Sequence, residues 1–215
     1  MNLLVLKIIT AILSYLLGSF PTAFVLYKIK TGKDIRSEGS GNVGGTNVAR
    51  TMGAGFGIMT VIVDILKAFI PITVVYFLFP GDLVLAAITA VVVVLGHDFP
   101  VYLKFRGGKG ISSSYGVIFG LCAYPFAQDI SLWLRVTPAI AILAAWLIIF
   151  AFSRMVSLAS LGAAIATPLA FFFSKYPMPI VIASICLFIL TFIAHKDNIK
   201  RLIKKEEKKI TGKGA

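Results

Sequence analysis

Charged residues are scarce in this 215-residue sequence, where they occupy only 14% of the positions. Soluble globular domains carry about a quarter of charged residues, whereas hydrophobic residues here reach 58% and the mean hydropathy is +0.93. A soluble chain of this length has too little interior to bury so much apolar surface, but a membrane protein exposes it to lipid. The composition therefore excludes a soluble domain and predicts an integral membrane protein.

Cysteine and histidine are also scarce, with two residues of each. Cys122 and Cys186 both lie inside apolar segments, which argues against a disulfide framework and against a cysteine-based metal site. His97 and His195 have no clustered set of acidic partners in the sequence, so a zinc site is not expected either. We expect no metal and no cofactor.

Acidic residues number only nine against 21 Lys and Arg, which gives a formal net charge of +12. The basic residues cluster in short segments between apolar runs, as in membrane proteins that follow the positive-inside rule. This distribution argues against nucleic acid as a partner. Anionic membrane phospholipids and phosphorylated substrates are the expected partners, and no obligate protein partner is indicated.

Long apolar runs dominate the rest of the sequence and predict an all-α, polytopic fold with seven transmembrane helices. The runs cover residues 3–27, 55–79, 83–103, 111–127, 137–153, 156–174 and 178–194. The polar connections are short and leave no room for a separate soluble domain. Residues 1–215 are therefore expected to form one membrane domain, with 196–215 as a basic cytoplasmic tail.

The distribution of basic residues predicts how the chain crosses the membrane. With seven spans, the connections 28–54, 97–110 and 153–155 share one side with the tail from 195, and together they hold 17 of the 21 Lys and Arg. Cytoplasmic loops carry the excess of Lys and Arg. The N-terminus is therefore expected outside and the C-terminus in the cytoplasm.

Two smaller patterns predict local structure. Asp64 and Lys67 stand three residues apart inside the second apolar run, where a helical ion pair is the simplest way to satisfy both charges. In the tail, Ile199, Leu202, Ile203 and Ile210 recur at helical spacing opposite a lysine-rich face, which is typical of a helix lying on an anionic membrane surface.

Two glycine-rich basic segments, residues 38–50 and 104–110, separate the apolar runs on the predicted cytoplasmic side. The G-x-G-x-x-G pattern at 39–44 follows a membrane helix instead of a strand, so it does not indicate a dinucleotide site. A Walker loop is also excluded, because Leu103 stands where its first glycine would be and neither Ser nor Thr follows Lys109.

What these segments do offer is an anion site, since glycine lets backbone N–H groups converge and Arg or Lys supplies charge. Phosphate-binding groups are expected at Ser40, Gly41, Asn42, Thr46, Arg50, Gly107, Gly108 and Lys109. Glycine- and lysine-rich loops that are merely solvated have a similar composition, so composition alone leaves both interpretations open.

Three motifs resemble those of one bacterial enzyme family. The runs Gly39–Arg50, Gly96–Gly110 and His195–Leu202 are similar to the motifs of the membrane acyl-phosphate:glycerol-3-phosphate acyltransferase family (PlsY). The resemblance spans nearly the whole chain. It implies seven transmembrane helices and an active site at the cytoplasmic face of the bacterial inner membrane. It further implies transfer of a fatty acyl group from acyl phosphate to the 1-hydroxyl of glycerol 3-phosphate, giving lysophosphatidic acid.

The resemblance also implies which residues form the active site. Ser40 and Arg50 match the first motif, Lys109 the second, and His195 and Asn198 the third; in the family these positions surround the phosphorylated substrates. These five are the expected catalytic residues, and Asn198 is also expected to help bind phosphate. The third motif departs from the family at Ala194 and Lys196, where Arg is usual, and at Lys205, where Gly is usual before the acidic position Glu207.

The expected mechanism is direct attack by the glycerol hydroxyl, because phosphate is already a good leaving group and no cysteine is placed to carry the acyl group. Arg50 and Lys109 would hold the phosphates and stabilise developing charge. His195 orients a substrate or accepts the proton; a substrate phosphate, whose second pKa is near 6, is the alternative base.

Two other functional classes are alternatives to an acyltransferase. A small polytopic anion transporter with a basic cytoplasmic vestibule is the main alternative, although transporters usually place broken polar helices near the membrane midplane. A CDP-alcohol-type phosphotransferase would need clustered metal-binding aspartates, which the sequence lacks.

Overall fold

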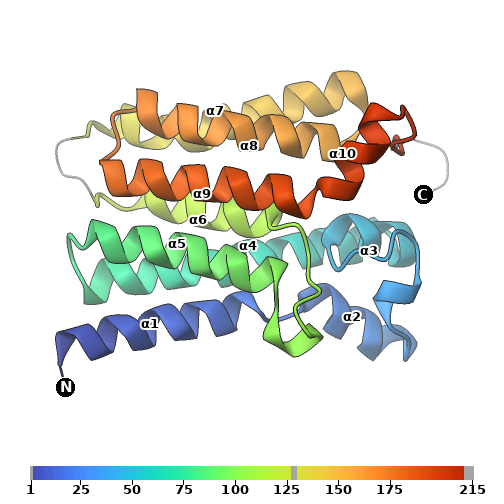
Figure 1. Ribbon diagram of the computed structural model, residues 1–215, viewed down its shortest axis with the longest axis horizontal. Coiled ribbons are helices and arrows are strands. Elements are labelled where there is room, and N and C mark those ends of the chain that lie inside the picture. Colours follow the sequence, from blue (N-terminus) through green and yellow to red (C-terminus); the bar gives the residue numbers. More distant parts are fainter. Residues whose placement is uncertain (1, 127–129, 211–215) are drawn as a thin grey trace.

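The structure, a computed structural model, describes residues 2–126 and 130–210, which form ten α-helices, two short 3₁₀ helices and no strand. Most helices run along the long axis of the molecule, as Figure 1 shows, and α1, α5, α9 and α8 follow one another as contacting neighbours. The all-α expectation is confirmed.

The first predicted span is broken into α1 (Leu3–Gly18) and α2 (Thr22–Thr31). Asn2 starts α1 by accepting a hydrogen bond from the Leu4 N–H at 3.0 Å, a standard N-cap. The break falls at Pro21, which lacks the N–H that a continuous helix would need. The break leaves the Phe20 carbonyl free to accept a hydrogen bond from another helix, as described below.

The next helices are α3 (Gly45–Met52), α4 (Ala54–Leu78), α5 (Leu83–Asp98) and α6 (Ile111–Ala123), with the 3₁₀ helices η1 (Ile35–Ser37) and η2 (Val101–Leu103) in the connections. Helix α4 lies against α3, α5 and α6. It therefore links the first glycine-rich segment to the interior of the bundle.

Glycines allow α4 and α6 to approach closely. A Cβ added at Gly116 of α6 would overlap the Ile65 carbonyl oxygen and lie 3.0 Å from the Ala68 Cβ, and one at Gly120 would lie 2.8 Å from the Ile72 Cγ2. Small residues let helix backbones pack tightly in membranes. The spacing of these two glycines is thus used for helix packing.

The C-terminal half contains α7 (Leu132–Ser153), α8 (Val156–Phe173), α9 (Met178–Ala194) and α10 (Lys196–Ile203). Helices α9 and α10 meet at an angle of 63°. The helix expected in the tail is therefore present as α10, but it ends at Ile203 and does not include Ile210, because the chain turns back at Lys204 and Lys205. Tail residues 211–215 lie outside the described residues.

Among the described residues, five helical stretches are long and apolar enough to cross a membrane, and six if the bent pair α9–α10 counts as one span. The stretches are Leu3–Thr31, Ala54–Leu78, Leu83–Leu103, Leu132–Ser153 and Val156–Phe173. Each of the seven predicted runs overlaps a helix, but α6 has only 13 residues. The integral membrane fold is confirmed; the number seven and the orientation remain predictions.

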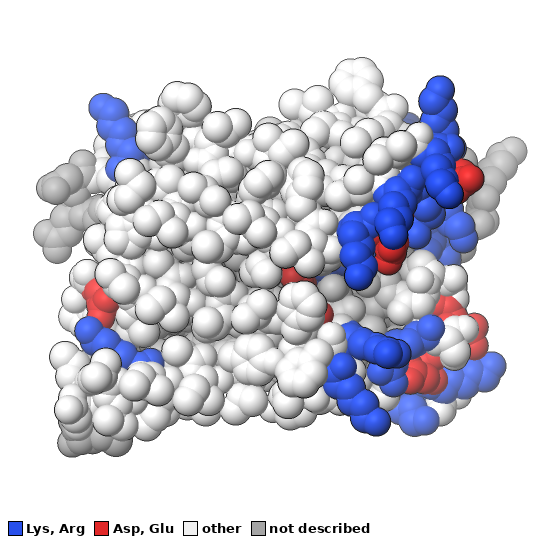
Figure 2. All heavy atoms as spheres, in the orientation of Figure 1, with Lys and Arg blue, Asp and Glu red and all other residues white. Residues whose placement is uncertain are grey.

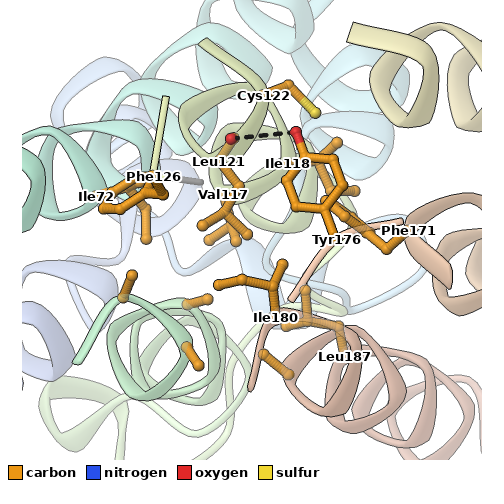
Figure 3. Packing of buried hydrophobic residues seen from close by; sticks show 14 of the residues in the cluster. Ile72, Val117, Ile118, Leu121, Cys122, Phe126, Phe171, Tyr176, Ile180 and Leu187 are labelled. Atoms are coloured by element: carbon orange, nitrogen blue, oxygen red, sulfur yellow. Dashed lines mark hydrogen bonds between the residues drawn. The ribbon is translucent and has the colours of Figure 1, made fainter. Parts of the chain in front are cut away.

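The apolar core lies where α4, α5, α6 and α9 meet (Figure 3). Ile72, Val117, Ile118, Ile180 and Leu187 are all at most 2% exposed there. At its edge the Tyr176 hydroxyl donates to the Leu121 carbonyl at 3.4 Å. This core fixes α6, and with it the loop that precedes α6.

Basic residues gather at one end of the molecule. On the face drawn in Figure 2, most blue Lys and Arg atoms lie at the end where Figure 1 places α2, α3 and α10, and a broad white band without charge separates them from the opposite end. The white band matches a lipid-facing belt. The basic end contains all three sequence motifs.

Candidate active site

Asn47 shapes the first glycine-rich segment. Its side chain is 1% exposed; Oδ1 accepts the Ser40 N–H at 2.8 Å and Nδ2 donates to the Glu38 carbonyl at 3.0 Å. The turn between them requires positive φ at Gly39 (61°) and Gly41 (71°), which glycine adopts without strain. A buried amide thus holds Ser40 in place through its backbone and leaves the Ser40 hydroxyl exposed.

Helix α3 starts at the end of this segment with an uncapped N-terminus. Gly44 is the N-cap residue, and no side chain accepts a hydrogen bond from the first turn. Thr46 and Arg50 lie four residues apart on α3 and therefore share one face. Exposed N–H groups, the helix dipole and a guanidinium together favour an anion.

The second glycine-rich segment folds back onto the end of α5. The Gly107 N–H donates to the Asp98 carbonyl and the Gly108 N–H to the His97 carbonyl, both at 3.1 Å. These two N–H groups are therefore used within the protein. The glycines shape the loop, while anion binding here depends on Lys109 and on the start of α6.

Helix α6 also begins without a side-chain cap. Its N-cap residue is Gly110 in the left-handed conformation, with φ of 68°. Lys109 directly precedes it. Both glycine-rich segments thus lead into a helix without a side-chain cap, but Lys109 directly precedes the N-cap of α6, whereas Arg50 lies in the last turn of α3.

Lys109 lies where the motifs meet. Its Nζ donates a hydrogen bond to Oδ1 of Asn198. Burial lowers the pKa of Lys109, and the nearby positive charges of Arg201 and Arg50 lower it further, against the opposing effect of Glu207 and Asp197. The fold has therefore brought Lys109 and Asn198, from the second and third motifs, into contact, with Arg50 of the first motif within electrostatic range of Lys109.

His195 lies between α9 and α10 and is 2% exposed. Its Nδ1 is 2.8 Å from the Thr191 carbonyl oxygen. A carbonyl can only accept, so this bond places the ring proton on Nδ1 and leaves the lone pair on Nε2. Nε2 is the atom through which His195 can accept a proton, and Lys109 lies within electrostatic range of the ring.

Asn198 is oriented by Glu207. Asn198 Nδ2 donates to Glu207 Oε1 at 2.7 Å, so Oδ1 faces Lys109. Glu207 also accepts from Ser157 Oγ at 2.9 Å and from Arg201 Nε at 2.7 Å. Burial acts to raise the pKa of Glu207, but the hydrogen bonds from Arg201, Asn198 and Ser157 outweigh it and hold the pKa below its ordinary value.

Residues 204–210 form a C-terminal strap that carries Glu207. The Glu206 N–H donates to the Arg201 carbonyl and the Ile210 N–H to the Arg154 carbonyl, both at 2.8 Å. The strap therefore ties α10 to the turn between α7 and α8. Sequence reasoning did not find the roles of Ser157 and Arg201; the only signal was the acidic position after the third motif.

A buried polar cluster lies beside the second glycine-rich segment. Lys67 Nζ is 2.9 Å from Asp64 Oδ1, as the i,i+3 spacing predicted, and also donates to the Phe20 carbonyl at 2.8 Å. Thr22 Oγ1 donates to Asp64 Oδ1 at 2.8 Å. All these side chains are at most 5% exposed. The ion pair joins α4 to the break between α1 and α2.

A small, mostly apolar cavity lies inside the bundle between α6, α7, α8 and α9. Its lining includes Ile111 and Thr191, together with Ser114, Tyr115, Ile118, Ile142, Ser160, Ala163, Ala164, Thr167, Leu187 and Phe188. Thr191 is also the residue whose carbonyl contacts His195.

The remaining predicted residues stay on the first segment. Ser40, Gly41, Asn42 and Thr46 make no side-chain hydrogen bond to the other motifs among the described residues. In residues 2–126 and 130–210, no group of three or more His, Cys, Asp or Glu side chains is placed to hold a metal ion. The site is therefore built from cations, amides, hydroxyls and one histidine.

Comparisons with known proteins agree on one family. The sequence profile described as glycerol-3-phosphate acyltransferase matches residues 8–205. A relative of that name from Endomicrobium trichonymphae is 39% identical over 207 residues, covering 96% of this chain and 97% of the relative. Another from Aquifex aeolicus is 38% identical over 194 residues, covering 89% and 93%.

Solved structures give the same result. The chain is similar to crystal structures of PlsY (YgiH), described as an integral membrane glycerol 3-phosphate acyltransferase. The glycerol 3-phosphate form matches with a TM-score of 0.84 and 35% identity, covering 95% of this chain and 96% of that one. The lysophosphatidic acid form matches with a TM-score of 0.82 and 33% identity, covering 97% of each.

Proposed function

The chain belongs to the glycerol-3-phosphate acyltransferase family, and we propose that it takes its acyl group from acyl phosphate at the cytoplasmic face of a bacterial inner membrane. The acceptor is glycerol 3-phosphate and the product is lysophosphatidic acid. The proposed donor carries a second phosphate, so the site must hold two phosphate groups at once. The comparisons do not support the transporter alternative.

The observation that carries the proposal is the pair of uncapped helices, with Lys109 directly before the N-cap of α6 and Arg50 in the last turn of α3. Helix α3 presents Arg50 and helix α6 follows Lys109, and these cations are close enough to affect each other. One dianion beside each helix start would offset the repulsion between Arg50 and Lys109. A thioester donor would leave one of these positions without a phosphate.

The proposed reaction is a single displacement at the acyl carbon. The 1-hydroxyl oxygen of glycerol 3-phosphate attacks the carbonyl carbon, a new ester C–O bond forms, and the C–O bond to phosphate breaks. The hydroxyl proton goes either to Nε2 of His195 or to a phosphate oxygen, and inorganic phosphate leaves. Arg50 and Lys109 stabilise negative charge on the leaving phosphate and on the carbonyl oxygen.

The remaining predicted residues have supporting roles in this proposal. Ser40 and Thr46 contribute hydroxyl groups beside the α3 N-terminus, and Gly41 and Asn42 form the turn that presents them. Asn198 holds Lys109, and Gly107 and Gly108 give the second loop its shape. The acyl chain lies among the apolar helices.

We further propose the topology that the basic residues predict. Seven spans, with α6 as the short one, place the N-terminus outside and the C-terminus in the cytoplasm. Residues 1–215 act as a single acyltransferase domain without an obligate protein partner. The basic end seen in Figure 2 then faces the cytoplasm and the anionic lipid headgroups.

A donor comparison tests the proposal. Purified protein in phospholipid vesicles is given glycerol 3-phosphate with either palmitoyl phosphate or palmitoyl-CoA, and lysophosphatidic acid is measured. We expect product with palmitoyl phosphate, with release of one inorganic phosphate per product, and none with palmitoyl-CoA. Product from the thioester alone would contradict the proposed donor.

A further inference from the structure

We propose that His97 is a positioning residue: its ring is wedged between the buried Asp64–Lys67 pair and Gly108, and this wedge sets the position of the loop that carries Lys109. The proposal rests on the proposed phosphate-binding role of that loop. His97 lies in the last turn of α5 and is 7% exposed.

The ring occupies the space beside Gly108. A Cβ built at Gly108 would overlap Nε2 of His97 and lie 2.8 Å and 2.9 Å from Cδ2 and Cε1, and no other atom is nearer to it. Gly108 does not have a positive φ. Glycine is therefore required at this position because of the imidazole and not because of the backbone conformation.

Backbone hydrogen bonds hold the loop against the ring. The His97 carbonyl accepts the Gly108 N–H at 3.1 Å, so one residue contacts Gly108 through both its backbone and its side chain. Lys109 is the next residue. A shift of the ring moves Gly108, and the Lys109 ammonium moves with it.

The other side of the ring faces the buried polar cluster. Nδ1 of His97 lies 3.7 Å from Asp64 Oδ1, too far for a good hydrogen bond. Thr22, Lys67 and the Phe20 carbonyl fix Asp64 in place. A small cavity in the same region is lined by Ser19, Thr22, Lys67, His97, Gly107 and Gly108, among other residues.

This arrangement explains why an ion pair is kept inside a membrane protein. A buried pair adds little stability compared with apolar residues of similar size, but it can impose one arrangement on the parts it joins. Here the pair joins α4 to the α1–α2 break and forms a fixed surface for the ring. The cluster therefore acts on the site through His97 without touching a substrate.

A double-mutant cycle tests the wedge. We expect Gly108→Ala to raise the KM of at least one phosphate substrate by roughly tenfold, with kcat changed less than about threefold, because loop placement mainly affects phosphate binding. The His97→Ala/Gly108→Ala double variant should have a lower KM than Gly108→Ala alone, because the methyl group then has room.

Gly107 provides the matched control. A Cβ at Gly107 would overlap the His97 carbonyl oxygen and lie 2.7 Å from that of Asp98, so removing the ring gives no relief. His97→Ala should therefore not rescue Gly107→Ala. Thr89→Val changes another buried residue of the same helix and should leave both KM values unchanged. His97→Gln should bind the phosphate substrates better than His97→Ala.

The same cycle is measured by thermal unfolding without substrate, so that it does not depend on the proposed reaction. We expect Gly108→Ala to lower the unfolding temperature and the double variant to regain part of the loss. A double variant with a higher KM and a lower unfolding temperature than Gly108→Ala would contradict the proposed role of the His97 ring. Another outcome is that the wild type makes no product from palmitoyl phosphate while the double variant still regains part of the unfolding temperature. That result would contradict the proposed donor and support the proposed role of His97.

Discussion

The environment of Lys109 is one in which a bound anion would stabilise the charged ammonium. Its ammonium is partly buried, has Asn198 as a neutral partner and lies within range of two further cations. Burial and the two cations disfavour the charged form of Lys109, and Glu207 and Asp197 offset them only in part. A bound phosphate dianion would add negative charge beside Lys109 and favour its charged form.

Replacement of Lys109 tests this directly. We expect Lys109→Ala to reduce kcat/KM by about 10²–10³-fold, the usual cost of removing one preorganised charge-stabilising group. Lys104→Gln removes an exposed charge from the same loop and should change kcat/KM less than about threefold. Steady-state assays with palmitoyl phosphate measure both, and similar losses would show that only the net charge of the loop matters.

Asn198 depends on its amide orientation. Asn198→Asp keeps an oxygen facing Lys109 but places a second carboxylate against Glu207. We expect a loss of about 1–3 kcal/mol in the free energy of unfolding, because the Glu207 oxygen loses its donor. Asn198→Asp/Glu207→Gln should recover part of it, since Gln can donate. Thermal unfolding in detergent measures both variants. A double variant less stable than either single variant would contradict the hydrogen bond between residues 198 and 207.

Local spacing predicted some of these contacts and not others. The Asp64–Lys67 pair follows from helical geometry, because residues three apart face each other within a single helix. The contact between Asn198 and Glu207 does not, since it requires the chain to turn back after α10. The contacts of Glu207 with Ser157, and of His97 with Gly108, depend on helices packing side by side. No periodicity in the sequence encodes that packing.

Among the helices, α4 and α6 pack closely against each other beside the site. The interface lets the Ile65 carbonyl lie directly over Gly116, and α6 in turn carries the loop with Lys109 at its start. Any widening between these helices would therefore move Lys109, the cation proposed to bind phosphate.

Alanine substitutions at two glycines separate this packing from helix propensity. Gly116→Ala should lower the free energy of unfolding by about 1–3 kcal/mol, the usual cost of overpacking. Gly55→Ala, in α4 with nothing within 4 Å of the added methyl, should be neutral or stabilising by up to about 1 kcal/mol. Thermal unfolding of both variants measures the difference, and equal effects would contradict the close contact.

The C-terminal strap predicts a pH dependence. The pKa of Glu207 is lowered by folding, so its contribution to stability is complete above the unfolded value, 4.5, and is lost as the pH falls through the folded pKa. Glu207→Gln should therefore be less stable than the wild type near pH 7, and the difference in stability should narrow as the pH falls below 4.5. Unfolding temperatures across this range provide the measurement, and a constant difference would exclude the ionised Glu207.

Apolar runs predicted the positions of the helices well, but not where they break. The first run continues past Pro21, yet the chain bends there and uses the free Phe20 carbonyl to bind Lys67. The run expected from 137 begins as a helix at Leu132, because Ser131 caps it by accepting the Leu134 N–H. Helix breaks and helix caps depend on single polar contacts, and hydropathy, which is a mean over many residues, does not detect them.

For the molecule as a whole, basic residues at one end imply a fixed orientation in the membrane. Lys175 lies in the turn between α8 and α9, whereas Lys200 lies on α10 at the basic end. Both side chains are exposed. In the proposed topology, these two positions would report on opposite sides of the bilayer.

Cysteine labelling tests the orientation. Lys175→Cys and Lys200→Cys are each placed in a chain with Cys122 and Cys186 replaced by alanine. A membrane-impermeant maleimide applied to intact spheroplasts should label position 175 and not position 200. Both should react after permeabilisation, which is the control, and labelling of position 200 alone in intact spheroplasts would reverse the proposed topology.

The C-terminal strap has a consequence for how the protein is made. Synthesis runs from the N-terminus, so Arg50 and Lys109 are joined to the chain well before Glu207. Until the ribosome adds that residue, Asn198 lacks the acceptor that turns its amide towards Lys109. A nascent chain can therefore insert its helices into the bilayer before Asn198 is turned towards Lys109, and the proposed phosphate site is assembled only once Glu207 has been translated.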